Sequence, residues 1–306
     1  MEQGRMLPTK WLLLQMATLF SLDEHSLFAA HHIELIKKGK GQGRPVSPQL
    51  ELLTIRNFPV AEPLSSFVES IIYYNNPHQS YIAEIVMPDG MPMLVIDLHR
   101  SSALLIGQRD TPMSLSLDKD IRKIIIRFHP DGLYRLSGIA QSDLLNEILD
   151  AEHIFGKPIR TLCREMTGQA DPDKLRRCIV KGLTFLLPDN DKDMLSGEVI
   201  RYMLRHIAEP IAALTRQTGY SQKHLAHLFR VHVGLTPKVF QQVIKFKTAI
   251  NDLSLLPTQQ LSGYNWSGNY FDQAHFTRQF TRFSGFTPVD YLRTGNTCPR
   301  MVLIRR

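Results

Sequence analysis

Ser221–Phe240 reads SQKHLAHLFRVHVGLTPKVF, and Asp272–Tyr291, 51 residues further on, reads DQAHFTRQFTRFSGFTPVDY. The two stretches align without a gap. The identical pairs are Gln222/Gln273, His224/His275, Phe229/Phe280, Gly234/Gly285, Thr236/Thr287 and Pro237/Pro288. An internal repeat of this kind can decide the architecture of a chain.

Each copy predicts a short helix, a tight turn and a second helix. Ser221 and Asp272 are typical N-cap residues, whose side-chain oxygens accept from free backbone N–H groups. Apolar residues then recur at helical spacing. Gly234 and Gly285 can end their helices in the left-handed conformation, and the Thr-Pro pair that follows each glycine is typical of a new helix start.

A further short helix is predicted before each copy. Ile211–Gln217 leads through Gly219 into the first copy, and Gln259–Gly268 leads into the second. Helix, sharp turn and helix is the helix-turn-helix arrangement, whose second helix enters a DNA major groove. A single copy would fit an ordinary helical hairpin in a bundle equally well, whereas two copies favour DNA binding.

One long helix is predicted to join the two copies, over Thr236–Leu256, with Lys238, Lys245 and Lys247 among its apolar residues. A helix of about 18 residues is about 27 Å long. This length suits two reading helices in successive major grooves, which lie about 34 Å apart along one face of DNA.

The positive charge of the chain is concentrated in its last third. Residues 199–306 contain 14 lysines and arginines against 4 acidic residues, a net charge of +10. The whole chain carries +7, so residues 1–198 carry −3. Clustered positive charge attracts the phosphate backbone without regard to sequence.

Residues from about Val199 to Thr294 resemble the double helix-turn-helix domain of the AraC/XylS family of bacterial transcription regulators. The segments that carry this resemblance are Gly219-Tyr220-Ser221, Gly234–Pro237, Tyr270–Phe276 and Gly285–Pro288. The resemblance implies a sequence-specific, non-enzymatic regulator that reads double-stranded DNA with helices 221–232 and 272–284. It also allows three further partners: RNA polymerase, a small-molecule effector and a second copy of the chain.

The second unit departs from the family pattern. Tyr264-Asn265 stands where the family usually has Ile-Ala, and Asn269 stands at the glycine of the turn. Asparagine adopts positive φ less freely than glycine. These departures leave a second hypothesis for the function of the chain. It would be a small-molecule-binding or metal-dependent cupin protein whose DNA-binding domain is degenerate.

The open side of each reading helix supplies the candidate DNA contacts. They are Gln222, Lys223, Ala226, His227 and Arg230 in the first unit, and Gln273, Ala274, Thr277, Arg278 and Arg282 in the second. Lysine and arginine can donate to guanine, glutamine can pair with adenine, and alanine can meet a thymine methyl group. Arg230 and Arg282, near the helix C-termini, are expected to contact phosphates, which position a protein without specifying sequence.

The region Leu50–Pro130 has the pattern of a β-rich domain. Short apolar or alternating runs are separated by turn signals, as is typical of a sandwich or barrel. These runs are Tyr81–Met87, Met93–Leu98, Ala103–Ile106, Met113–Leu117 and Ile121–Phe128. Helices are predicted over Leu133–Phe155 and Pro172–Leu187. The resemblance implies a cupin-like β-barrel with helices, which senses a small molecule or dimerises.

No catalytic or cofactor motif accompanies this pattern. Asp97 and His99 could be metal ligands and His129 could add a third, but two candidates on one strand fall short of a catalytic metal site. Phosphate loops, nucleophile elbows and paired-acid motifs are lacking. Cys163, Cys178 and Cys298 form no CxxC pair, which suits a reducing cytoplasm. We therefore expect no metal, no cofactor and no enzymatic activity.

The chain is thus predicted to be a two-domain α+β protein. A poorly defined extension and linker over residues 1–48 precedes a cupin-like domain over 49–190, a double helix-turn-helix domain over 191–296 and a tail over 297–306. Trp11–Phe20 fits either a signal peptide or, better, an extra helix. No apolar run reaches the length of a membrane span, and a cytoplasmic location is expected.

Overall fold

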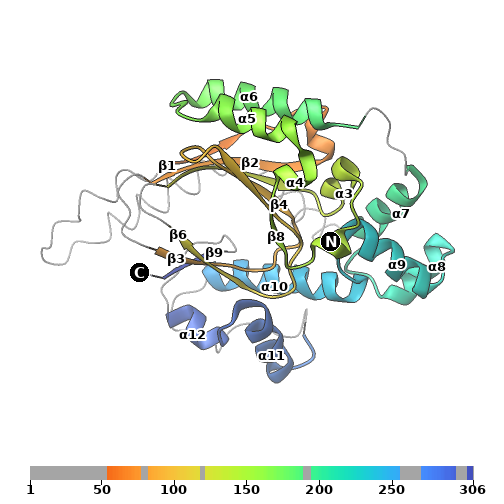
Figure 1. Ribbon diagram of the computed structural model, residues 1–306. Coiled ribbons are helices and arrows are strands. Elements are labelled where there is room, and N and C mark those ends of the chain that lie inside the picture. Colours follow the sequence, from red (N-terminus) through yellow and green to blue (C-terminus); the bar gives the residue numbers. More distant parts are fainter. Residues whose placement is uncertain are drawn as a thin grey trace, which may run out of the picture. The chain divides into compact units, whose positions relative to one another are not determined.

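The computed structural model describes residues 54–76, 82–117, 121–188, 194–255, 270–293 and 302–305 (Figure 1). The expectations for residues 1–48, for the helix over 259–268, for Asn265 and Asn269, and for Cys298 all lie outside these residues. Residues Gln49–Arg306 belong to one compact unit.

The N-terminal part of the described chain is built on two antiparallel sheets. The larger sheet contains, in order, β1 (Thr54–Phe58), β2 (Val68–Asn76), β7 (Ile121–Phe128), β4 (Met93–Asp97), β5 (Ser102–Ile106) and β8 (Ile148–Asp150). The smaller one contains β6 (Met113–Leu117), β3 (Ile82–Val86) and β9 (Val302–Arg305). The five strands predicted from the sequence are confirmed. Four further strands, β1, β2, β8 and β9, were not predicted from the sequence.

The predicted closed barrel is not seen. Among the described strands no hydrogen-bonded ladder joins the two sheets. Side chains join them instead: Val86 and Met113 of the smaller sheet pack with Ile106 of the larger one. The larger sheet ends at β8, which has only three residues and leads directly into helix α4 (Glu152–Phe155). Such a short edge strand offers few backbone groups for closure.

The helical prediction over Leu133–Phe155 is correct only in part. This segment forms α3 (Gly132–Ser137), the 3-10 helix η3 (Gln141–Leu144), β8 and α4. Gly138 ends α3 at φ +70° and Asn146 reverses the chain at φ +63°. Only a few non-glycine residues, asparagine foremost, adopt positive φ, and each such residue interrupts a helix. The apolar spacing fitted a helix, but tertiary pairing of β8 with β5 decided the outcome.

Helices α5 (Lys157–Met166) and α6 (Pro172–Leu186) cover one face of the larger sheet (Figure 1). In the middle of that sheet, Ile126 lies opposite both Ile71 and Leu94. These three side chains are buried with Leu162 of α5 and Ile179 of α6 in one cluster. This is the core of the N-terminal part, and it is placed on the helix-covered face.

The described residues 194–255 and 270–293 of the C-terminal part are mainly helical, as predicted. Its described helices are α7 (Met194–Arg205), α8 (Ile211–Thr218), α9 (Gln222–Val233), α10 (Pro237–Leu255), α11 (Gln273–Ser284) and α12 (Pro288–Arg293). The predicted linker helix agrees with α10 to within one residue at each end. Aromatic side chains dominate the core, in which Phe229, Phe246, Phe276, Phe280 and Phe283 are fully buried.

Phe280→Ala tests the importance of this aromatic core. Phe280 touches the rings of Phe246, Phe276 and Tyr291, so its truncation leaves a cavity. We expect a loss of about 3–5 kcal/mol in the free energy of unfolding, measured by urea denaturation. Phe185→Ala is the matched control, because Phe185 is 75% exposed on α6 and should cost less than about 0.5 kcal/mol. Equal losses in the two variants would contradict this account.

Candidate nucleic-acid interface

The first reading helix, α9, starts and ends as its sequence predicts. The Ser221 hydroxyl accepts from the His224 N–H at 3.2 Å, and this caps the N-terminus. The Tyr220 ring stacks on His224 with 4.7 Å between ring centroids. Gly234 ends the helix at φ +88°. Both ends of the helix are therefore fixed by local contacts, so the side chains between them have defined directions.

The sides of α9 divide into a buried and an open face. Leu225 and Phe229 are fully buried and Leu228 is half-buried. Of the five candidate contacts on this helix, four are exposed and Ala226 is half-buried; the exposed ones are Gln222, Lys223, His227 and Arg230. The predicted open face is thus present on the surface of the molecule.

The second reading helix, α11, repeats this arrangement. The Asp272 carboxylate accepts from the His275 N–H at 2.6 Å, and Gly285 ends the helix at φ +77°. Its exposed candidates are Gln273, Ala274, Arg278 and Arg282, while Thr277 is half-buried.

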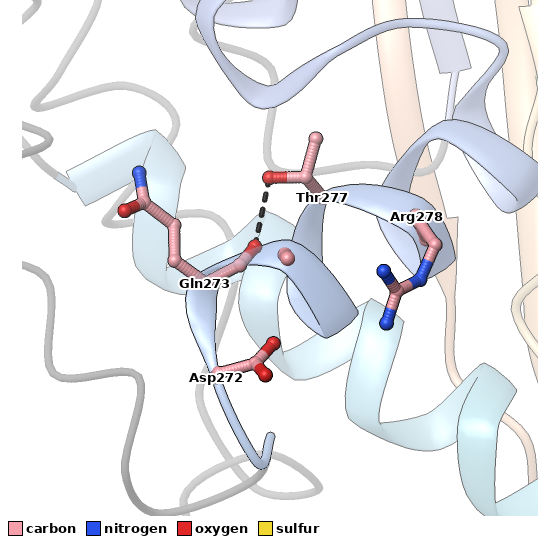
Figure 2. Close-up of a pocket in the computed structure, with 5 residues that line it drawn as sticks. Asp272, Gln273, Thr277 and Arg278 are labelled. Atoms are coloured by element: carbon pink, nitrogen blue, oxygen red, sulfur yellow. Dashed lines mark hydrogen bonds between the residues drawn. The ribbon is translucent and has the colours of Figure 1, made fainter.

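A shallow, open recess lies at the N-terminal end of α11. It is lined by Asp272, Gln273, Ala274, Thr277 and Arg278, so it brings together four of the five candidates of this unit (Figure 2). The Thr277 hydroxyl donates to the Gln273 carbonyl at 2.9 Å, which turns its methyl group away from that bond (Figure 2). The amide of Gln273 and the guanidinium of Arg278 are the donor and acceptor groups that match base edges in a major groove.

His275 makes two local contacts through its ring nitrogens. Its Nδ1 accepts from the Phe271 N–H at 3.4 Å, and its Nε2 lies 2.8 Å from the side-chain amide of Gln279. Both ring nitrogens of His275 are thus engaged by close neighbours, and the imidazole links the Phe271 backbone to the Gln279 side chain.

Arg282 makes a contact that the sequence analysis did not foresee. Its guanidinium donates to the Asp110 carboxylate at 3.0 Å. Asp110 follows β5 and also accepts from the Asn146 side chain at 2.8 Å. The pair joins residues 172 positions apart, and no local sequence pattern could have indicated it. A DNA phosphate would therefore compete with the Asp110 carboxylate for the guanidinium of Arg282.

The lysines of α10 do not share one role. Lys247 is half-buried beside Asp89, Arg127 and Glu69. Desolvation lowers the pKa of its amine, and the nearby Asp89 carboxylate partly opposes this. Lys238 is exposed and Lys245 half-buried on another side of the helix. Of the three lysines that the sequence placed on the linker, Lys247 therefore faces the β-rich part of the chain.

Among the candidate metal ligands, Asp97 stabilises the turn that follows β4. The Asp97 carboxylate accepts from the backbone N–H groups of His99 and Arg100, at 2.9 and 3.0 Å. Within the described ranges, no cluster of three or more His, Cys, Asp or Glu could hold a metal ion. Nor does any helix in that part of the chain have the length and apolarity needed to cross a membrane.

Two family models match the chain. One, described as a helix-turn-helix domain, matches residues 214–294, which contain both reading helices. The chain is a transcription regulator whose residues 214–294 form a helix-turn-helix DNA-binding domain of the AraC type. The other model, a domain of unknown function, matches residues 56–150 of this regulator, within the β-rich part.

Solved structures of ToxT from Vibrio cholerae are similar to the regulator at low identity. One covers 79% of this chain and 98% of its own, with 13% identity and a TM-score of 0.36. That of ToxT from strain O395 covers 75% and 98%, with 14% identity and a TM-score of 0.34. That of wild-type ToxT with a bound unsaturated fatty acid covers 76% and 97%, with 13% identity and a TM-score of 0.35. Such distant likenesses indicate no function. No curated protein matches the chain.

Asp110→Asn tests the competition for Arg282. Release of Arg282 for a phosphate should lower the Kd for DNA and steepen the slope of log K against log salt by about 0.9. Both quantities can be measured by fluorescence anisotropy of a labelled duplex. Asp173→Asn, at an exposed position of α6, makes the same charge change elsewhere and should have no such effect. A gain that persists in the Arg282→Ala background would rule out Arg282 as its cause.

Proposed function

We propose that this regulator binds one DNA site with both helix-turn-helix units, so that α9 and α11 enter successive major grooves. The observation that carries this proposal is the repetition of the surface as well as the core. Both helices have a capped N-terminus, a left-handed glycine at the end and an exposed row of polar residues between them. A net charge of +10 over residues 199–306 adds attraction to the DNA backbone.

The residues divide by their chemistry and position. Lys223, Gln273 and Arg278 lie in the N-terminal halves of their helices, where a recognition helix contacts base edges. Ala226 and Ala274 suit thymine methyl groups. The remaining candidates of the interface, Gln222, His227 and Thr277, lie beside these residues. Arg230 and Arg282 come later in the helices and suit phosphates, which fix register and orientation.

The N-terminal part is proposed to control DNA binding, through a small-molecule effector or through dimerisation. Support comes from its packing on the linker helix. Ile85 and Met87 belong to the same buried cluster as Phe240 of α10. A Cβ atom on Gly90 would lie only 2.9 Å from the Phe240 ring. A ligand or partner that shifts these strands would therefore press on the helix that holds both reading helices. Action in the bacterial cytoplasm, with RNA polymerase as partner, belongs to the same proposal.

Selection of genomic DNA fragments by the full-length protein tests the proposal. Fragments retained at raised salt should share one motif with two half-sites about one helical turn apart. A motif with a single half-site would restrict base reading to one unit. Retention that disappears with salt and enriches no motif would leave a nonspecific basic surface and overturn the proposal.

Arg278→Ala tests one base contact. If Arg278 reads a guanine, its loss should cost about 1–3 kcal/mol in binding and relax the preference at one position of the motif. The preference is measured by repeating the selection with the variant. Arg177→Ala, at an exposed position of α6, is the matched control and should leave the motif unchanged. An equal loss of affinity for every sequence would assign Arg278 to a phosphate instead.

A further inference from the structure

A second recess lies between the linker helix and the second reading helix, and it has no role in the proposal above. It has a volume of about 360 Å³. Its lining residues are Lys238, Gln241, Gln242 and Lys245 of α10, with His275 and Gln279 of α11. All six are cationic or polar, and no carboxylate is among them.

The two lysines share one side of α10. They are seven residues apart, close to two helical turns, so their side chains lie one above the other. Gln242 lies between them at the helical spacing of i+4 from Lys238. The opposite side of α10 is occupied by the β-rich part. Phe240 and Ile244 lie against Gly90. Lys247 lies near Asp89. The recess therefore collects positive charge on the side of α10 that turns away from the β-rich part.

Hydrogen-bond donors complete the recess. Gln241 is committed, because its amide donates to the Glu209 carbonyl at 2.7 Å and so anchors α10 to the chain before α8. Gln279 is committed as well, because its side-chain amide lies 2.8 Å from His275 Nε2. Two ammonium groups and the amide of Gln242 thus border one polar space. Such a set suits an anion with several acceptor oxygens.

We propose that this recess holds a backbone phosphate of the DNA segment that runs between the two grooves read by α9 and α11. The inference rests on the proposed function. Lys238 follows the Gly234 turn that ends α9, and His275 and Gln279 flank the reading side chains of α11. A duplex that touches both helices must pass the space between them. The contact adds affinity without sequence preference and fixes the spacing of the two reading helices on DNA.

The double variant Lys238→Ala/Lys245→Ala tests this site in the full-length protein. Loss of two phosphate contacts should make the salt slope shallower by about 1.8. The ratio of variant to wild-type Kd for the selected DNA site should then fall about 12-fold between 50 and 200 mM salt. The selected motif should stay the same, and Lys238→Arg/Lys245→Arg should restore the wild-type slope.

Lys174→Ala/Lys181→Ala is the matched control, with two exposed lysines of α6 at the same spacing of seven residues. It makes the same change in net charge away from the recess and should keep the wild-type slope. Equal thermal unfolding midpoints establish that both variants fold. If the double variant unfolds, Lys238→Ala alone should still lower the slope by about 0.9.

Three results would overturn the inference. The first is a wild-type slope in the recess variant, and the second is an equal change in the control. The third concerns inorganic phosphate. If millimolar phosphate stabilises the free protein through both lysines, while the salt slope of DNA binding is the same with and without them, the recess is a site for a phosphorylated ligand. A wild-type protein that enriches no motif would refute the proposed function itself, so the two failures are distinguishable.

Discussion

The C-terminal part depends on one kind of aromatic contact that occurs in both units. In each unit, a ring of the reading helix packs edge-to-face on a ring of the helix that follows it. In the first unit, Phe229 meets Phe240 with centroids 5.4 Å apart and ring planes at 64°. In the second, Phe280 meets Tyr291 at 5.5 Å and 68°. These are equivalent positions of the repeat, so the repeat has preserved a packing geometry as well as residue types. Such contacts add stability beyond the burial of apolar area.

Phe246 then links the two units through α10. Its ring lies 5.3 Å from both Phe280 and Phe283 of α11. A helix has one direction for each side chain, so aromatic contacts at Phe240 and Phe246 orient both reading helices with respect to one rigid body. Protein interiors are close-packed, and a shift at one of these rings must be taken up by its neighbours. The exposed rows of α9 and α11 are consequently defined by the core beneath them.

The sequence predicted what local signals determine. Ser221, Asp272, Gly234 and Gly285 act within one or two turns of the backbone, so their roles as caps could be inferred from residue type and spacing. The helix over Leu133–Phe155 could not be assigned in this way, because its apolar spacing fitted a helix while strand pairing with β5 decided the structure. Whether a short apolar run forms a helix or a strand depends on its tertiary contacts.

Contacts between distant segments were also beyond sequence reasoning. Arg282 was correctly placed on the open side of α11, but nothing in the chain near it points to Asp110. Lys238, Lys245 and Lys247 looked alike as charges on one predicted helix, whereas the structure separates them onto two sides. The strand β9 near the C-terminus pairs with β3, although its sequence only indicated a tail. In each case the sequence does not show which distant part of the chain packs against the residue or strand.

These opposing surfaces give α10 three different sides, and this explains why a rigid helix connects the two units. One side holds the aromatic core, a second packs on Gly90 and Met87 of the β-rich part, and a third carries the polar recess next to α11. A flexible linker would allow each reading helix to move alone. With a helix, a displacement imposed by the β-rich part moves the core contacts and the recess together. Under the proposed control by the N-terminal part, base reading and phosphate binding would respond as one unit, and DNA would compete with Asp110 for Arg282.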